Sequence, residues 1–189
     1  MIYGPASQSR GRSRVQGDFD KRMTATPASS GRKFLVPEII QTSSMDCGPA
    51  ALSALLNGLG VHASYGRLRE ACQTSVDGTS IDTLEAVSQQ LGLRAEQVMV
   101  PADHVALDDD GAGDGGLPAI VVVQHADLGA HFVVVWRRIG RWLQVMDPAS
   151  GRRWMSVERL RQQLYRHEAV VDAADWCAWA ASDENGRAL

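Results

Sequence analysis

Several features that define whole classes of proteins are scarce or missing in this sequence of 189 residues. Cysteine occurs three times, at positions 47, 72 and 177, and this odd count at wide spacing fits neither a disulfide framework nor a zinc site made of Cys-x-x-Cys pairs. No run of 18 apolar residues is present, and no apolar stretch follows the basic N-terminus. The sequence therefore predicts neither a membrane-spanning helix nor a secretory signal, and we expect a reducing compartment.

A strong excess of one charge is also lacking, because the formal net charge is only −3. Such a balance gives no general attraction to nucleic acid or to anionic lipid. The average hides an asymmetry, since residues 1–33 carry seven Lys or Arg against two Asp, and the rest of the chain carries a net charge of −8. A hydrophobic fraction of 44% and a charged fraction of 22% fit one soluble globular domain with tails.

The patterns that are present divide the chain into three parts. Residues 1–33 are rich in Ser, Arg, Gly and Thr without apolar periodicity, which predicts a disordered basic extension. Residues 34–171 carry the regular patterns and are expected to form the folded domain. Residues 172–189 hold Trp176 and Trp179, whose spacing predicts a short amphipathic helix at the start of a linker to a further domain.

Apolar residues at helical spacing predict three helices in the first half of the folded domain. The first helix carries one apolar stripe and ends at Gly60, with Asp46 as its N-cap, and the stripe consists of Leu52, Leu55, Leu56 and Leu59. A second helix is expected over residues 64–72. A third begins at Ser80, ends before Gly92 and is expected to bury Ile81, Leu84, Val87 and Leu91.

After Gly92 the apolar period changes to that of strands. We expect a short strand, a helical turn and an acidic loop over residues 95–100, 101–107 and 108–116. Three strand-like runs follow at 119–124, 131–137 and 141–147, with a hairpin turn at 138–140 between the last two. The remaining expectations are a strand at Trp154, a helix from Ser156 to Leu164 and a closing strand at 169–171. Helices followed by an antiparallel sheet predict an α+β domain.

One cysteine lies where a helix is expected to begin, in the segment Gln41-Thr-Ser-Ser-Met-Asp46-Cys47-Gly48-Pro49. The amide groups and dipole of a helix N-terminus favour a thiolate, so Cys47 is a candidate nucleophile. Gly48 would leave room for a substrate backbone. Taken alone, Cys47 is more simply a small buried residue.

His131 begins a buried strand, and Asp147 ends the next strand of the same hairpin. The two residues lie about eight positions on either side of the turn, so their side chains are expected to be neighbours on one face. Asp147 would then accept the imidazole N–H and fix its tautomer. Gln41, six residues before Cys47, is a candidate donor to the oxygen of a tetrahedral intermediate. Singly, these residues also fit a structural histidine, an Asp-Pro turn and a solvated glutamine.

At these residues the chain resembles the double-glycine leader peptidases, the papain-like cysteine peptidase domains of bacteriocin and peptide ABC exporters. Their cysteine motif has Gln, four residues and then Asp-Cys, as in residues 41–55. Their histidine motif, His-Tyr/Phe-Val-Val with Asp-Pro sixteen residues after the histidine, is matched by His131-Phe-Val-Val and Asp147-Pro148. The resemblance covers residues 36–170.

This resemblance implies a half-papain fold, in which helices carrying the cysteine face an antiparallel sheet carrying His and Asp. It implies cleavage after a Gly-Gly or Gly-Ala pair that ends a leader peptide, coupled to export of the cargo. Cys47 would be the nucleophile, His131 the general base and then acid, Asp147 the orienting residue and Gln41 the oxyanion donor. No metal or cofactor is implied. The implied partners are the leader-bearing precursor and the transmembrane and ATPase domains of an exporter, fused or separate, on the cytoplasmic side of the bacterial inner membrane.

Two departures from the family pattern leave other functions open. Forty residues precede Gln41, which usually lies near the N-terminus in the family, and no GxxxxGK[ST] motif follows. The chain is therefore either one domain of an exporter or a freestanding peptidase. The alternatives are a docking module that only holds the leader, and a papain-like acyl transferase or amidase.

Other residues with chemical potential are interpreted as structural. Residues 108–114 contain four aspartates but lack the arrangement of a calcium loop, so a solvated loop is expected. Four further histidines are scattered and have no partner at metal-ligand spacing: His62, His104, His125 and His167. Cys72 and Cys177 are expected to be packing residues. Three tryptophans on strands are expected to be core or groove walls: Trp136, Trp142 and Trp154.

Overall fold

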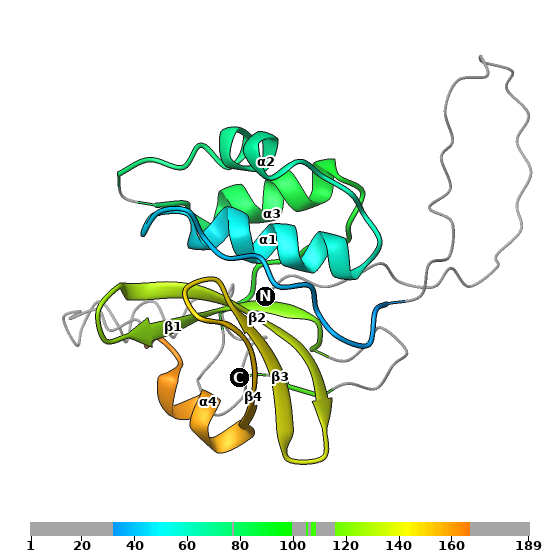
Figure 1. Cartoon of the computed structure of the whole chain (residues 1–189), viewed down its shortest axis with the longest axis vertical. Helices are drawn as coiled ribbons and strands as arrows, with labels where there is room; N and C mark the ends of the chain where they lie inside the picture. The colour runs from blue at the N-terminus through cyan, green and yellow to red at the C-terminus, as the bar shows by residue number, and fades with distance from the viewer. Residues whose placement is uncertain (1–31, 77, 100–104, 106, 109–115, 167–189) are drawn as a thin grey trace, which may run out of the picture.

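The computed structural model describes residues 32–76, 78–99, 105, 107–108 and 116–166. Three helices form one layer, namely α1 (Cys47–Gly58), α2 (Tyr65–Ala71) and α3 (Ile81–Gln90). They cover one face of a four-stranded sheet, and α4 (Val157–Gln163) packs on the other face (Figure 1). The expected α+β class, with helices first and the sheet after them, is confirmed.

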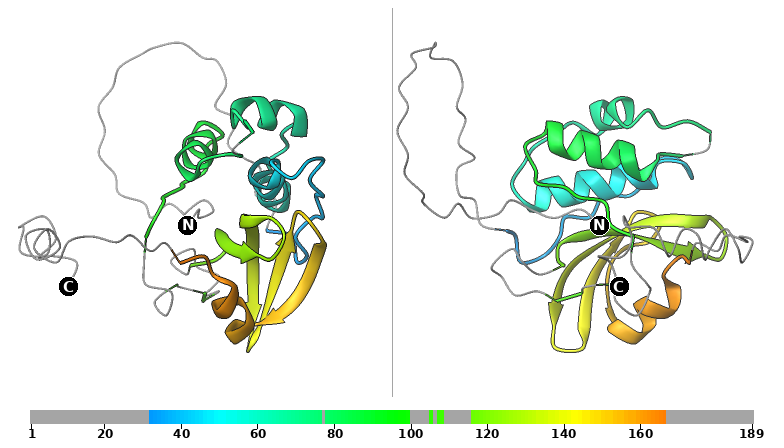
Figure 2. Two further views of the ribbon diagram at one scale, coloured as in Figure 1. Left: turned by 90° about the vertical axis from the view of Figure 1, so that its left-hand side faces the viewer. Right: turned by 180° about the vertical axis from the view of Figure 1, so that it is seen from behind.

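The sheet is an antiparallel meander in the order β1 (Ala119–His125), β2 (Gly129–Ile139), β3 (Trp142–Asp147) and β4 (Gly151–Ser156). Side chains alternate between two cores, because successive residues of a strand point to opposite faces. On β2, Val134 and Trp136 join the core under the helices, whereas Val133 and Val135 join the core under α4. Figure 2 shows from two further sides that the helix layer and α4 flank the sheet.

Helix α1 lies directly on β2 and forms the centre of the helix layer. All its residues are buried except Asn57, and Leu52, Leu55 and Leu56 are fully buried, as the leucine stripe predicts. At Gly58 the helix lies close to Trp136, because a β carbon added at position 58 would collide with the indole ring. The chain then leaves the helix through Gly60 at φ +79°, a conformation that favours glycine.

The segment before α1 joins the two layers. The Lys33 amide donates to the Gly58 carbonyl at 3.0 Å, and the Lys33 carbonyl accepts from the Trp136 indole, also at 3.0 Å. Further along, the Val36 amide donates to Gln144 Oε1 at 2.8 Å. This segment therefore contacts α1, β2 and β3 in turn before it reaches the loop at 41–46.

Most of the expected helices and strands are present with small shifts of their ends. Ser64 and Ser80 precede α2 and α3, as predicted, and the Ser80 hydroxyl accepts from the Thr83 amide at 3.2 Å. The prediction that Leu91 is buried is wrong, since it is 37% exposed just after α3. The β2–β3 turn falls one residue later than expected, between Ile139 and Trp142.

The short strand predicted over residues 95–100 is wrong for its described part, residues 95–99. Those residues are neither helix nor strand, and they are hydrogen-bonded to side chains of α3 instead of to a neighbouring strand. Gln89 donates to the Ala95 carbonyl at 2.9 Å, and the Gln97 side chain donates to Asp82 at 2.8 Å. The change of apolar period after Gly92 therefore predicted a strand where the described backbone has no strand beside it.

Several predictions fall outside the described residues. These are the basic extension, most of the turn and loop between 101 and 115, the closing strand at 169–171 and the C-terminal segment. Within the described residues, no helix is long and apolar enough to cross a membrane.

Candidate active site

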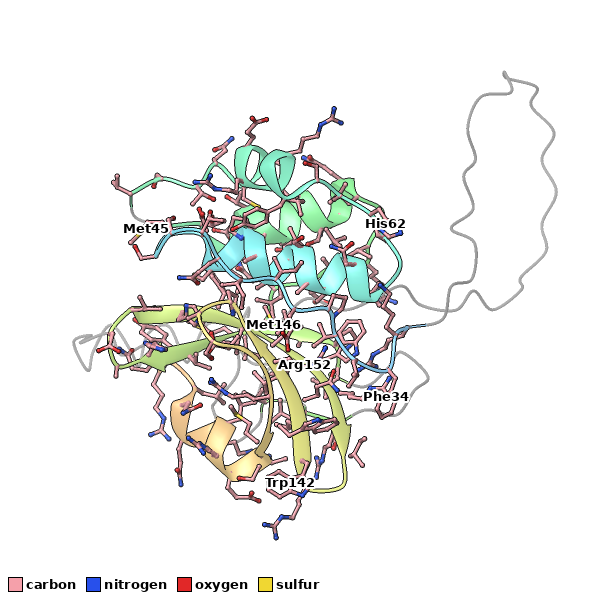
Figure 3. All side chains as sticks on the ribbon, in the orientation of Figure 1. Phe34, Met45, His62, Trp142, Met146 and Arg152 are labelled. Carbon is pink, nitrogen blue, oxygen red and sulfur yellow. The ribbon has the colours of Figure 1, made fainter. Side chains whose placement is uncertain are left out.

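Cys47 is the first residue of α1, at the point where the helix layer meets the sheet. The residue is buried, with 8% of its surface exposed. Met45, in the loop just before Cys47, lies at the end of the helix layer (Figure 3). Met146, which precedes Asp147, lies between the helix layer and the sheet. The helix N-terminus thus presents the thiol to the ends of β2 and β3, which carry the other candidate residues.

His131 and Asp147 are both buried and are hydrogen-bonded, with 2.8 Å between His131 Nε2 and Asp147 Oδ1. The expectation that the hairpin would pair them directly needs one correction. The β2–β3 register contains a bulge between Val135 and Arg137 and ends at Val134↔Met146, so His131 lies beyond the last paired position. The carboxylate therefore reaches the imidazole diagonally, from the end of its strand.

The thiol and the imidazole shift each other's pKa. Burial raises the pKa of Cys47, but the adjacent His131 ring with its charge and the Phe132 amide outweigh it and leave the pKa lowered. Burial lowers the pKa of His131, but its bond to Asp147 and the adjacent Cys47 outweigh it and raise the pKa to about 9. Both shifts favour the charged forms, a thiolate beside an imidazolium.

The ring nitrogens of His131 have different surroundings. Nε2 is hydrogen-bonded to Asp147, so Nδ1 is the ring nitrogen that can exchange a proton with the thiol. Nδ1 is buried and has no hydrogen-bond partner among the described residues. The proton that moves during a reaction would therefore be carried by Nδ1, while the carboxylate fixes the orientation of the ring.

Gln41 is tied to the same corner of the molecule. Its amide donates to the Pro148 carbonyl at 2.9 Å, directly after Asp147. Its side chain is partly buried, and Oε1 has no hydrogen-bond donor among the described residues. The loop thus brings Gln41 to the end of β3 that carries Asp147, and donation to an oxyanion stays a prediction.

Asp46 occupies the N-cap position of α1, as predicted, but its side chain makes no cap bond. Instead its fully buried carboxylate accepts from Thr42 Oγ1 at 2.6 Å and from Arg69 Nε of α2 at 2.9 Å. Burial raises its pKa, but these hydrogen bonds lower it further, so the carboxylate is ionised. The pair fixes the loop before Cys47 to the neighbouring helix, a contact between distant residues that periodicity does not reveal.

Gly48 does not face a substrate as expected. A β carbon at this position would lie 3.0 Å from Thr79 Cβ and 3.5 Å from the Leu84 side chain. Glycine here allows α1 to pack closely against the start of α3.

The remaining candidates divide as follows. Cys72 is buried, and burial raises its pKa to about 11, which fits the expected packing role. His125 has a neighbour that the sequence did not reveal, because its ring lies edge-on to the His131 ring with 5.5 Å between centroids. No group of His, Cys, Asp and Glu in the described part of the chain could hold a metal ion. His104, His167 and Cys177 lie outside the described residues.

A model of the Peptidase C39 family matches residues 36–171. The chain belongs to the peptidase C39 family. This is a family of cysteine peptidases, so the chain is a cysteine peptidase by descent. The match begins at Val36, in the segment that joins the two layers, and includes Gln41, Cys47, His131 and Asp147.

Relatives of this C39 peptidase include small proteins and large transporters. An uncharacterized protein of Methanothermobacter marburgensis is 32% identical over 123 residues, which are 64% of this chain and 79% of that protein. The lactococcin-G-processing and transport ATP-binding protein of Lactococcus lactis subsp. lactis is 31% identical over 114 residues, 60% of this chain. The match spans only 16% of that transporter.

Solved structures share the fold. The peptidase domain of Streptococcus ComA, described as a bifunctional ABC transporter involved in a quorum sensing pathway, has a TM-score of 0.59 and 26% identity over 68% of this chain and 92% of that domain. A double glycine motif protease from an AMS/PCAT transporter, solved with the leader peptide, has a TM-score of 0.59 and 23% identity over 72% of this chain and 89% of that protein. The second likeness supports the fold alone.

Proposed function

We propose that this C39 peptidase is a cysteine endopeptidase that cleaves leader peptides after a Gly-Gly or Gly-Ala pair. The observation that supports the proposal most directly is the buried line from Asp147 through His131 to Cys47, with the thiol pKa lowered and the imidazole pKa raised. A thiolate at a helix N-terminus is the nucleophile that peptide-bond cleavage at neutral pH needs.

The geometry supports a two-step reaction. The Cys47 thiolate attacks the carbonyl carbon of the second small residue, and the resulting oxyanion accepts hydrogen bonds from the Cys47 amide and the Gln41 side chain. The His131 imidazolium gives its Nδ1 proton to the leaving amine, and a thioester remains on the sulfur. His131 then takes a proton from water, the hydroxide attacks the thioester, and Cys47 leaves as a thiolate. Asp147 holds the ring throughout.

The relatives support the choice of substrate and partner. Curated relatives are named as processing and transport proteins for lactococcin G, pediocin PA-1 and microcin H47, and one solved relative contains a leader peptide. The substrate would accordingly be a precursor with an N-terminal leader, and the partner an ABC exporter that is fused or separate. In that arrangement the peptidase works on the cytoplasmic side of the membrane, where reducing conditions keep Cys47 free.

The test is cleavage of a synthetic precursor in which a leader ending in Gly-Gly precedes a short cargo, followed by mass spectrometry. We expect one cut after the second glycine, and a fall of roughly 10³-fold or more in rate for Cys47→Ala. Cys72→Ala is the matched control, because this cysteine is buried in the helix layer and should be replaceable without loss of cleavage.

Other outcomes separate the remaining functions. Binding of the leader by both the intact protein and Cys47→Ala, with no cut by either, would replace the proposal by a docking module. Transfer of the acyl group to an added amine in preference to water would indicate an acyl transferase that uses the same thioester chemistry. Cleavage that persists in Cys47→Ala would rule out Cys47 as the nucleophile.

A further inference from the structure

The carboxylate of Asp147 is hydrogen-bonded on all sides, and only one of its donors is His131. Oδ1 accepts from His131 Nε2 and from the Ala149 amide, both at 2.8 Å. Oδ2 accepts from Ser150 Oγ at 2.8 Å and faces Arg153 Nη1 at 3.1 Å. Two donors on each oxygen use the usual capacity of a carboxylate.

The same arginine nitrogen also fixes the direction of the serine proton. Arg153 Nη1 donates to Ser150 Oγ at 2.6 Å. Because a guanidinium can only donate, the serine oxygen must accept from it and direct its own proton to Asp147. Arg153 thus acts on the carboxylate twice, once directly and once through an oriented hydroxyl.

The register of β3 and β4 explains why Arg153, and not its neighbour, reaches this carboxylate. Asp147 pairs with Gly151 and Val145 pairs with Arg153, so the arginine lies two residues along the same face as Asp147. Gly151 places no side chain between them. Arg152 points to the other face, where it donates to the Val36 carbonyl at 2.7 Å and lies 3.6 Å from Glu38 (Figure 3).

We propose that Arg153 is a positioning residue of the active site, which shares the Asp147 carboxylate with His131 and so sets the upper end of the pH range in which the imidazolium persists. This inference rests on the proposed function only in that it takes His131 as the acid of the reaction. Arg153 touches neither the thiol nor the imidazole and acts through Asp147.

The direction of the effect follows from the charges around the site. His131 faces Cys47 on α1, Asp147 on β3 and His125 on β1, and Asp147 faces His131 and Arg153. A cation near Oδ2 partly neutralises the negative charge of the carboxylate that stabilises the imidazolium. The same cation also repels the imidazolium. Without Arg153, the imidazolium shares Asp147 only with the uncharged donors Ala149 and Ser150, and it loses its proton at higher pH. The arginine side chain is 41% exposed, so solvent moderates the effect.

The test uses the full chain and needs no peptide substrate. Iodoacetamide alkylates the thiolate of Cys47, and mass spectrometry of the Cys47 peptide gives its rate separately from other cysteines. The rate against pH has a lower inflection where the thiolate–imidazolium pair forms and an upper one where the imidazolium loses its proton. We expect Arg153→Met to move the upper inflection to higher pH by roughly 0.5 to 1 unit.

Matched variants distinguish this role from a structural one. Arg152→Met removes the same charge from the adjacent residue on the other face and should leave the upper inflection in place, while Arg153→Lys should restore most of its position. Arg153→Gln, which keeps a donor without the charge, replaces Arg153→Met if the latter fails to fold. An inflection that stays or moves down in Arg153→Met and Arg153→Gln, or moves equally in Arg152→Met, would overturn the proposal.

Because alkylation involves no leader, the two proposals can fail separately. If the upper inflection shifts in Arg153→Met but no leader is cleaved, the role of Arg153 stands and the proposed substrate is wrong. Leader cleavage with an unchanged upper inflection in Arg153→Met would retain the substrate and withdraw the role of Arg153.

Discussion

The Cys47 thiol and the His131 imidazole have pKa values shifted in opposite directions, and Asp147 maintains the difference. Its own pKa lies well below the usual range because hydrogen bonds from His131, Ala149 and Ser150 outweigh the effect of burial. Asp147→Asn should therefore move the upper inflection of the alkylation profile to lower pH, opposite to Arg153→Met. We also expect leader cleavage to fall by about 10²- to 10⁴-fold, because the imidazole loses its fixed orientation. An unchanged pH profile in Asp147→Asn would contradict the assigned role.

At the same scale, Asp46 is a buried anion whose partners hold the loop before Cys47. Asp46→Asn should lower the free energy of unfolding by about 1–3 kcal/mol, since it removes a charge-assisted bond but leaves Arg69 able to reach water. Arg69→Met should also destabilise, because it leaves the buried carboxylate without its cation. Denaturant titration measures both, with Arg67→Met, at an exposed position of the same helix, as the control. A loss in Arg67→Met equal to that in Arg69→Met would argue against the buried pair.

At the scale of elements, the position of the nucleophile depends on how closely α1 approaches β2. Gly58→Ala places a methyl group against the Trp136 ring and should destabilise the protein by about 1–3 kcal/mol. Gly66→Ala on α2 is the matched control, because the nearest atom, Ser64 Oγ, is 4.0 Å away. There alanine should be neutral or stabilise by up to about 1 kcal/mol, as expected of a helix interior. Thermal unfolding of both variants checks the pair, and equal effects would contradict the close packing.

The elements were the part of the structure most open to prediction from sequence. The leucine stripe of α1, the serine caps of α3 and α4 and the strand alternation each depend on local patterns, and the structure contains all of them. The segment at 95–99 shows the limit of prediction from local patterns, because a strand needs a neighbouring strand that its own sequence does not specify. The bulge between Val135 and Arg137, which brings Asp147 one position nearer to His131, is equally invisible, since it depends on packing between strands.

For the whole molecule, the site lies where the two layers meet, and its residues come from segments up to 106 positions apart (Gln41 to Asp147). The motif predicted which side chains meet, because their types and spacing suit one chemistry. Two supporting contacts could not be predicted, that of Arg69 with Asp46 and that of Arg153 with Asp147. The first depends on how α2 packs beside α1, and the second on the face of the sheet to which β4 turns each arginine.

These supports give the whole molecule a predicted response to acid. Asp46 in the helix layer and Asp147 in the sheet layer both have lowered pKa values in the folded state, so the unfolded chain binds more protons as the pH falls below about 4. Their stabilising effect is present above that pH and is lost as the pH falls through the folded values. The urea midpoint of the intact protein should therefore fall steeply between about pH 5.5 and pH 2.5. The double variant Asp46→Asn with Asp147→Asn should start lower and fall less, whereas Asp82→Asn, a change at an exposed position of α3, should retain the steep fall. Parallel curves for the intact protein and the double variant would mean that these two carboxylates are not what makes folding sensitive to acid.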